Sequence, residues 1–265
     1  MSHLVFNVSS IRQDSPNLKT YVFEHNLRAK PGQFVMVWMP GVDEVPMSIG
    51  WQTDTEFHLG IANVGDCTNA ISEKIKVGDR LGIRGPFGTS FDFADYDHII
   101  GVGGGYGTPP MLSLAQGASK LGKKVTIIQG ARSKEYLLYE DLFAKLDVTM
   151  QLATDDGSEG HKGYTTDLLE EELKSLDKSQ KTCIYTCGPE AMMVKVAKLG
   201  VEYNVDSQVS LERFMKCGFG ICGQCCMDDS GIRLCKEGPV IAGKYALEHP
   251  EFGNYSRKQS GLKNK

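Results

Sequence analysis

Hydrophobic residues in the first third of the chain occur in short runs that are separated by glycine, proline and aspartate. Among them are KTYVFEH (19–25), GQFVMVWMP (32–40), EFHLGIA (56–62) and DRLGIRGPFG (79–88). Short β-rich runs with turn residues between them are typical of an antiparallel barrel or sandwich. We therefore predict an antiparallel β-barrel domain over residues 1–95.

After Asp97 the pattern changes to apolar strands that alternate with helical segments. The strands are HIIGV (98–102), KKVTIIQGA (123–131), VTMQLATDD (148–156) and KTCIYTCG (181–188), and the helices are MLSLAQGASKLG (111–122), LLYEDLFAKL (137–146), TTDLLEEELKSL (165–176) and PEAMMVKVAKLG (189–200). Alternation of this kind predicts a parallel sheet that is covered by helices. An α/β domain is therefore expected over residues 96–204.

The last quarter of the chain follows neither pattern. Residues 205–240 carry a cluster of cysteines and too few apolar residues for a core of their own, so we predict a small segment that folds around a metal centre. The tail over residues 241–265 ends in EFGNYSRKQSGLKNK (251–265), which has little apolar content. We expect that end to be either loosely ordered or draped over a partner. The predicted fold class is multidomain, β followed by α/β, with a small C-terminal segment.

Composition and charge exclude several classes of protein. The chain has 265 residues, of which 41% are apolar, and its net charge is −4. It lacks the concentrated basic surface that nucleic-acid binding requires. The apolar run FVMVWMP (34–40) is far shorter than the roughly 20 residues that cross a bilayer, and the first residues do not form a signal peptide. We expect a soluble, cytoplasmic protein without a nucleic-acid or membrane partner.

Four cysteines have the spacing of a metal site. The order is Cys217-x4-Cys222-x2-Cys225-x9-Cys235, and its first three positions match the pattern by which plant-type ferredoxins hold a [2Fe–2S] cluster. Glycines within this loop would let the backbone point its N–H groups at the sulfurs. Structural zinc is the main alternative, although zinc ribbons present two C-x2-C pairs and this loop has one. Buried thiols without a metal are the third.

A glycine loop, GVGGGYGTPP (101–110), follows the first predicted strand of the α/β domain and opens a helix. Backbone amides in such a loop, together with the helix N-terminus, form a site for a phosphate or pyrophosphate. The loop departs from the strict G-x-G-x-x-G, so a plain tight turn is the alternative. GARS (130–133) stands where an acidic ribose-binding residue is usual, which leaves NAD and NADP both open.

Six segments carry a resemblance to a known family, and together they span nearly the whole chain. They are PMSIG (46–50), VGDCT (64–68), GVGGGYGTPP (101–110), TDDGSEGHKGYTTDLL (154–169), CGPEAMM (187–193) and LERFMKCGFGICGQC (211–225). With the FGNYSRKQSG tail, they resemble the electron-transfer subunit of heteromeric dihydroorotate dehydrogenase, a member of the ferredoxin reductase-like superfamily. The glycine loop and CGP occur throughout that superfamily, whereas the cysteine motif and the tail point to this subunit.

The resemblance implies FAD between the first two domains and a nicotinamide on the second. The implied FAD positions are Pro46, Met47, Ser48, Ile49, Gly60, Ile61, Ala62, Gly65, Cys67 and Thr68. The implied nicotinamide positions are Gly103, Gly104, Gly105, Gly107, Thr108, Gly188 and Pro189, with Cys187 near the ring or, alternatively, an ordinary thiol at a strand end. Val45 replaces the family arginine that meets the flavin diphosphate, and Cys67 replaces a glycine. These two departures would weaken FAD binding or change its pose unless Arg84 or another cation compensates.

By the same resemblance the chain is an oxidoreductase component of pyrimidine biosynthesis. Electrons would pass between NAD(H), FAD and the [2Fe–2S] cluster, and then to FMN in a separate catalytic subunit where dihydroorotate and orotate interconvert. Two copies of each subunit would form a heterotetramer. The alternatives are a stand-alone reductase, the equivalent subunit of a hydrogenase or transhydrogenase, an α/β domain that no longer uses nicotinamide, and a zinc-stapled module that senses a nucleotide.

Overall fold

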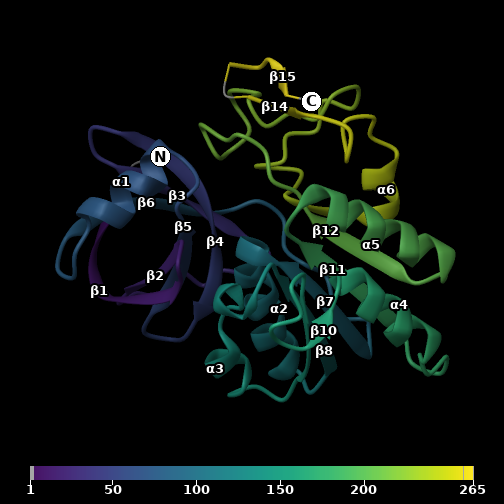
Figure 1. Ribbon diagram of the computed structural model, residues 1–265. Coiled ribbons are helices and arrows are strands. Elements are labelled where there is room, and N and C mark those ends of the chain that lie inside the picture. Colours follow the sequence, from purple (N-terminus) through teal and green to yellow (C-terminus); the bar gives the residue numbers. More distant parts are fainter. Residues whose placement is uncertain (1–2, 259, 265) are drawn as a thin grey trace.

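The first part of the chain forms a closed antiparallel barrel, as predicted (Figure 1). The computed structural model describes residues 3–258 and 260–264. The barrel strands are β1 (Leu4–Ser15), β2 (Leu18–Phe23), β3 (Phe34–Met39), β4 (Asp43–Gln52), β5 (Phe57–Ala62) and β6 (Arg80–Phe87), in the order β1-β2-β5-β4-β3-β6. Helix α1 (Asp66–Lys74) joins β5 to β6. Alternate strand residues face the interior, where the rings of Phe23 and Phe57 stack at 4.9 Å.

The second domain is a mainly parallel sheet between helices. Its strands are β7 (His98–Gly104), β8 (Lys124–Ala131), β9 (Thr149–Thr154), β10 (His161–Lys162), β11 (Thr182–Cys187), β12 (Asp206–Ser210) and β13 (Val240–Ala242). They run in the order β10-β9-β8-β7-β11-β12-β13, and β13 is antiparallel to β12. The helical elements are the 3-10 turns η1 (Gly105–Gly107) and η2 (Lys134–Tyr136) and the helices α2 (Thr108–Ser119), α3 (Glu140–Phe143), α4 (Thr165–Lys174) and α5 (Glu190–Glu202).

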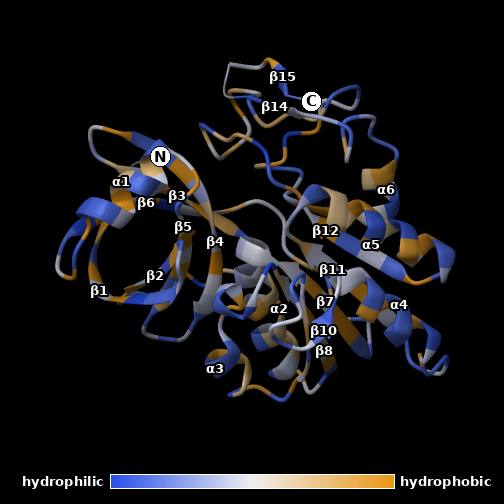
Figure 2. Cartoon of the chain, viewed as in Figure 1, coloured by the Kyte–Doolittle hydropathy of each residue, from blue (hydrophilic) through white to orange (hydrophobic). Residues whose placement is uncertain are grey.

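Neighbouring residues of the central strands pack on opposite faces of this sheet. Ile99 packs with the buried side of α2, whereas Ile100 packs with α4 and α5 on the other face. Figure 2 shows the hydrophobic strands at the centre of the domain. Because both faces are covered, these strands carry continuous apolar runs rather than an alternating pattern. The sequence therefore predicts the α/β architecture correctly.

One predicted helix is much shorter than expected. The segment 137–146 is helical only over α3, because Leu137 is extended and Tyr139 adopts a left-handed φ of 62°. The Tyr139 hydroxyl lies 2.9 Å from the Thr20 hydroxyl of the barrel. This contact between domains holds the backbone out of the helix that its local sequence favours.

Residues 211–239, called here the cysteine segment, contain no helix or strand and share the core of their neighbours. Met215, Met227 and Leu234 belong to one buried cluster with barrel residues Phe34, Met36 and Phe87 and with α5 residues Met193 and Ala197. None of the helices in the described part of the chain is long and apolar enough to cross a membrane.

The tail differs from the prediction, because it folds back onto the cysteine segment. It contains α6 (Gly243–Leu247) and the hairpin strands β14 (Ser256–Arg257) and β15 (Lys263–Asn264). Gln259 and Lys265 of the predicted tail motif lie outside the described residues. Arg257 donates to the Asp228 carboxylate at 2.7 Å and Tyr255 donates to it at 2.5 Å. These polar contacts act together with the burial of Phe252, which belongs to the same hydrophobic cluster as Met215. The tail has few apolar residues, so its sequence did not indicate this packing.

Candidate functional site

The glycine loop lies at the carboxyl edge of the parallel sheet, between β7 and α2. Gly107 packs so closely on the end of β11 that a Cβ atom there would lie 2.3 Å from the carbonyl oxygen of Cys187. Glycine is therefore required at this position by the approach of two backbones. The first turn of α2 continues with Thr108 and two prolines, which suit a position where an N–H has no helical partner.

A cavity of about 670 Å³ opens beside this loop, between the sheet edge and the barrel. Its wall includes Leu18 and Ala62 of the barrel, and Gly104, Gly105 and Pro189 of the α/β domain. This volume falls in the range of small-molecule and cofactor sites. Of these residues, Ala62, Gly104, Gly105 and Pro189 were predicted, and the structure brings them together from segments far apart in the sequence.

Other predicted nucleotide residues support the cavity without lining it. Gly103 and Thr108 lie against each other beneath the loop, with the Thr108 hydroxyl 3.4 Å from a Cβ built at Gly103. Gly188 has a left-handed φ of 145°, which only glycine tolerates without strain. These residues shape the backbone rather than present side chains to a ligand.

Several cavity residues were not predicted from the sequence. They are Arg132, Tyr136, Tyr164 and Lys195. The Arg132 guanidinium lies 3.6 Å from the centre of the Tyr136 ring. The signal that could have identified Arg132 is its place just after β8, since ligands bind at the carboxyl ends of parallel strands.

Cys187 ends β11 and is buried, with a neutral thiol. Burial raises the pKa of this thiol well above its usual range, and the charge of Glu212 raises it further. Glu212 is a candidate that sequence reasoning missed, although it follows the end of β12 directly. It keeps contact with solvent, but desolvation by crowded protein atoms, followed by the charge of Glu190, raises its pKa to about 7.

Among the predicted flavin positions on β4 and β5, Gly60 faces the α/β domain. A Cβ atom built at Gly60 would lie 2.3 Å from the Tyr139 hydroxyl and 3.2 Å from the Pro109 ring. Pro46, Met47 and Ser48 pair with Met36, Val35 and Phe34 across β3. Ile49 and Ile61 are buried in the barrel core, so their backbone is what remains available to a ligand at this edge.

The N-terminus of α1 holds the remaining flavin positions. The Thr68 hydroxyl accepts from the backbone N–H groups of Val64 and Gly65 at 3.1 and 3.0 Å. Cys67 is buried in the barrel, where its Sγ lies 3.4 Å from the carbonyl oxygen of Asp43. The cysteine that replaces the family glycine therefore points inward and does not obstruct the helix N-terminus.

Arg84 does not compensate for the missing arginine at position 45. Val45 packs against the barrel core, while the Arg84 guanidinium binds Glu44 and the carbonyl oxygen of Cys217. With 6% of its side chain exposed, Arg84 has no free edge for a flavin diphosphate. The guanidinium of Arg84 is therefore occupied by Glu44 and by the cysteine loop.

The four predicted cluster cysteines lie in two neighbouring pairs, Cys217 with Cys222 and Cys225 with Cys235, since the side chains interact within each pair. The first pair is partly or fully exposed and the second is buried. Each iron of a [2Fe–2S] cluster takes two of four thiolates. Among the described residues, no three or more His, Cys, Asp or Glu side chains converge closely enough to hold a single metal ion. A cluster whose irons each take two cysteines does not require such a group.

Backbone N–H groups point at the cysteine sulfurs. Gly220 donates to Cys235 at 3.1 Å, Ile221 to Cys217 at 3.3 Å, and Cys235 to Cys225 at 3.4 Å. Burial alone would raise the pKa of Cys217, but the backbone N–H groups of Cys222, Phe219 and Ile221 lower it to about 6. In contrast, burial and the nearby Cys225 raise the pKa of Cys235 to about 12. Such donors compensate the negative charge of sulfur ligands, so the loop fits an iron–sulfur cluster.

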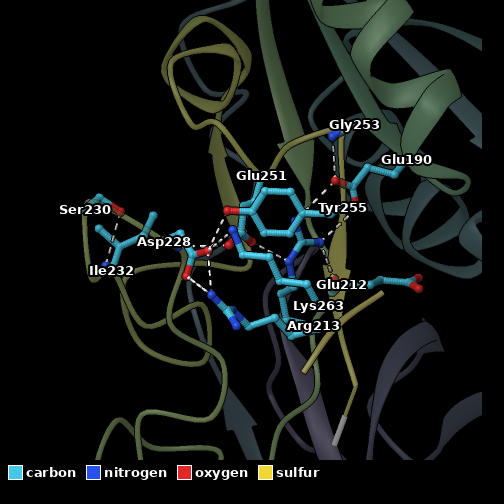
Figure 3. A network of polar contacts seen from close by, with 11 residues as sticks. Glu190, Glu212, Arg213, Asp228, Ser230, Ile232, Glu251, Gly253, Tyr255 and Lys263 are labelled. Carbon is cyan, nitrogen blue, oxygen red and sulfur yellow. Dashed lines mark hydrogen bonds and ion pairs between the residues drawn. The ribbon is translucent and has the colours of Figure 1, made fainter. Parts of the chain in front are cut away.

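A buried polar network joins the cysteine segment to α5 and the tail (Figure 3). Arg213 donates to Glu251 at 2.7 Å and to Glu190 at 2.8 Å. Glu251 also accepts from the backbone N–H of Asp228 at 2.9 Å, and Glu190 accepts from that of Gly253 at 2.7 Å. This set is called the Arg213 network below. It connects the end of the nucleotide cavity with the loop that carries the cysteines.

Comparison with known proteins agrees with this arrangement. A family model for the oxidoreductase NAD-binding domain matches residues 102–198, and one for the iron–sulfur cluster binding domain of dihydroorotate dehydrogenase B matches residues 212–245. A solved structure of NADH-dependent reduced ferredoxin-NADP oxidoreductase is similar, with a TM-score of 0.81 and 26% identity over 91% of this chain and 89% of the other. The fold and the domains define an oxidoreductase component of the ferredoxin reductase-like type.

Curated relatives narrow this class. A protein of Methanocaldococcus jannaschii is 45% identical over 98% of this chain and 97% of its own length, and one of Methanocella arvoryzae is 42% identical over 96% and 95%. Both are named as the electron transfer subunit of a probable dihydroorotate dehydrogenase B (NAD(+)). The chain belongs to the family of dihydroorotate dehydrogenase B electron transfer subunits. The resemblance identified from the sequence is confirmed.

Proposed function

We propose that the chain transfers electrons between NADH and the catalytic subunit of a dihydroorotate dehydrogenase. FAD would be held by the barrel, and a [2Fe–2S] cluster by Cys217, Cys222, Cys225 and Cys235. In this proposal FMN in the catalytic subunit is the next acceptor, and two copies of each subunit form a heterotetramer. The observation that carries the proposal is the central place of the barrel, which lines the nucleotide cavity and also holds the cysteine loop through Arg84.

The three groups would supply a change from two-electron to one-electron transfer, since nicotinamide carries hydride, flavin carries one or two electrons, and the cluster carries one. In this chain, Gly104 and Gly105 let a pyrophosphate approach the backbone beside the start of α2. Arg132 and Lys195 place positive charge on the same cavity wall. The neutral Cys187 and the titratable Glu212 lie where β11 and β12 end, so Glu212 would hold a proton there near neutral pH.

The surface of the cysteine loop supports a partner at this end of the molecule. Phe214, Phe219 and Ile221 are large apolar residues with 49%, 39% and 77% of their area exposed. Cys222, one of the proposed ligands, is exposed beside them. An apolar surface next to a redox group suits docking of a protein that receives the electron. A cytoplasmic location is proposed because all eight cysteines are free thiols.

Rapid mixing of the anaerobically purified protein with NADH and with NADPH tests the proposal. We expect bound FAD and two iron atoms per chain, flavin bleaching with NADH at a much higher rate than with NADPH, and subsequent bleaching of the cluster. The name of the relatives, which includes NAD(+), supports NADH as the donor. A colourless protein that contains zinc, or a flavin that neither nucleotide reduces, would contradict the proposal.

The partner is tested separately, with the catalytic subunit from the same source. We expect the mixture to elute as one complex with equal amounts of both chains and to oxidise dihydroorotate with NAD+ as acceptor. The isolated chain should show little turnover of dihydroorotate. Transfer to ferredoxin without any need for the catalytic subunit would instead favour a stand-alone reductase.

A further inference from the structure

The first part of the cysteine loop rests directly on the barrel. Gly218 has a left-handed φ of 78°, and a Cβ atom there would lie 2.8 Å from Met36 Cγ and 3.2 Å from the Phe87 ring. The Phe219 ring lies 6.4 Å from that of Phe87. The backbone beside Cys217 is therefore pressed against β3 and β6 of the domain that is proposed to hold the flavin.

A buried ion pair lies at this contact. Arg84 Nε and Nη2 donate to the two carboxylate oxygens of Glu44 at 2.8 and 2.5 Å, and Arg84 Nη1 donates to the carbonyl oxygen of Cys217 at 3.0 Å. The exposed fractions of the Arg84 and Glu44 side chains are 6% and 17%. The guanidinium thus lies between the carboxylate and the first cysteine of the loop.

We propose that Arg84 is a positioning residue for Cys217, and that the Arg84–Glu44 pair acts as a fixed dipole that sets the reduction potential of the cluster. This inference rests on the proposed function, because it requires a [2Fe–2S] cluster on the four cysteines. The positive end of the dipole faces the loop, and the negative end is held farther from it by the fork geometry of the guanidinium.

The sign of the effect follows from charge. Reduction adds one electron to the cluster without making or breaking a bond, so nearby positive charge favours the reduced form and nearby negative charge opposes it. Arg84 therefore raises the potential and Glu44 lowers it. Because the pair is buried, salt screens it weakly.

A second arginine provides an internal comparison. Arg233 donates to the carbonyl oxygen of Gly220 at 2.7 Å and pairs with Glu237, but its side chain is 35% exposed. It makes the same kind of contact with the same loop in a wetter environment. The effect of Arg233 on the potential should consequently fall as ionic strength rises, whereas that of Arg84 should not.

The test is a redox titration of the full-length protein, followed by the electron paramagnetic resonance signal of the reduced cluster. Arg84→Gln leaves Glu44 with only the His3 ring, 2.8 Å away, as a partner and should lower the potential, whereas Glu44→Gln leaves Arg84 without its carboxylate and should raise it. The expected size is on the order of a tenfold change in the one-electron equilibrium constant, about 59 mV. The double variant should return close to the potential of the unmodified protein.

Arg80→Gln is the matched control, because Arg80 is an exposed arginine on the same strand as Arg84 and its replacement removes the same charge. The reduction potential of the cluster should not change in this variant. Shifts of Arg84→Gln and Glu44→Gln in the same direction, or no larger than that of Arg80→Gln, would overturn the inference while leaving the proposed function intact. If Arg84→Gln fails to bind iron, the sign of the Glu44→Gln shift decides. Absence of iron from the unmodified protein would instead refute the proposed function.

Discussion

The nucleotide cavity lies at the edge of a sheet with its own core, whereas the cysteine segment packs on residues from the barrel, from α5 and from the tail. The strands behind the cavity are covered on both faces by helices of the same domain. In contrast, Met215, Met227 and Leu234 are buried in a cluster that includes Phe34 and Met36 of the barrel and Met193 of α5. The first site depends on local backbone geometry, and the second depends on contacts between distant segments.

The largest expected effect is the loss of iron from the cysteine segment when a buried cysteine of the proposed ligand set is replaced. We expect Cys225→Ser to abolish iron binding and to unfold much of residues 211–239, because metal binding supplies folding free energy to a segment without its own core. Iron content and hydrogen exchange check this. Cys226→Ser, at a neighbouring cysteine outside the proposed ligand set, should keep its iron. Normal iron in Cys225→Ser would show that the two sites do not differ in this way.

The next effect concerns the Arg213 network. Arg213→Met leaves the buried Glu251 without its partner, which costs about 3–5 kcal/mol for pairs of this kind. We expect residues 211–239 and the tail to exchange amide hydrogens faster, with little change in the barrel. Lys174→Met removes an exposed pair with Glu170 and should leave stability and amide exchange nearly unchanged, because water and salt screen such pairs. Equal exchange in the two variants would contradict the role assigned to Arg213.

A third variant affects the cavity and leaves the cysteine segment alone. Gly107→Ala places a methyl group against the carbonyl oxygen of Cys187, so the loop must shift. We expect flavin reduction by NADH to slow on the order of 100-fold, as misplacement of a substrate by about 1 Å can produce. Iron content and FAD absorbance should be unchanged. Reduction at the normal rate would show that this backbone contact does not shape the nucleotide site.

The smallest expected effect is a pH dependence of protein stability that comes from Glu212, which lies where the sheet meets the cysteine segment. Its folded pKa of about 7 is raised above the unfolded value, so the charged form is disfavoured in the fold. The resulting destabilisation is absent at low pH, grows as the pH rises toward about 7, and is complete above it. Because the Glu212 side chain is exposed, solvent reduces this effect, and Glu212→Gln should raise the Tm slightly, more at about pH 8 than at about pH 5. An equal gain in Tm at both pH values would show that Glu212 does not titrate with a raised pKa in the folded protein.

Patterns within a few residues predict much of this molecule. The alternation of short strands predicts the barrel, the strand and helix rhythm predicts the sheet, and the cysteine spacing identifies the loop. Contacts across long separations lie outside such patterns. The bond between Arg84 and Cys217 spans 133 residues, and that between Tyr139 and Thr20 spans 119. The second of these explains why a helix expected over 137–146 shortens to one turn.

Arg84 and Arg132 show that contacts between distant residues also decide what a side chain does at the candidate sites. From the sequence, Arg84 is a free cation that suits a diphosphate, because nothing nearby in the chain indicates its pairing with Glu44 and Cys217. Arg132 is one residue past a strand, and only the assembled sheet places it on the cavity wall. The residue types are visible in the sequence, but their partners are set by the tertiary fold.

The fold of the tail over the cysteine segment has a consequence for synthesis of the protein. Arg213 and Asp228 have partners, Glu251 and Arg257, that follow the last cysteine of the segment in the sequence. A ribosome-bound chain that has just released Cys235 still lacks these two partners. During synthesis the cysteine segment is therefore made before part of the structure that holds it in place.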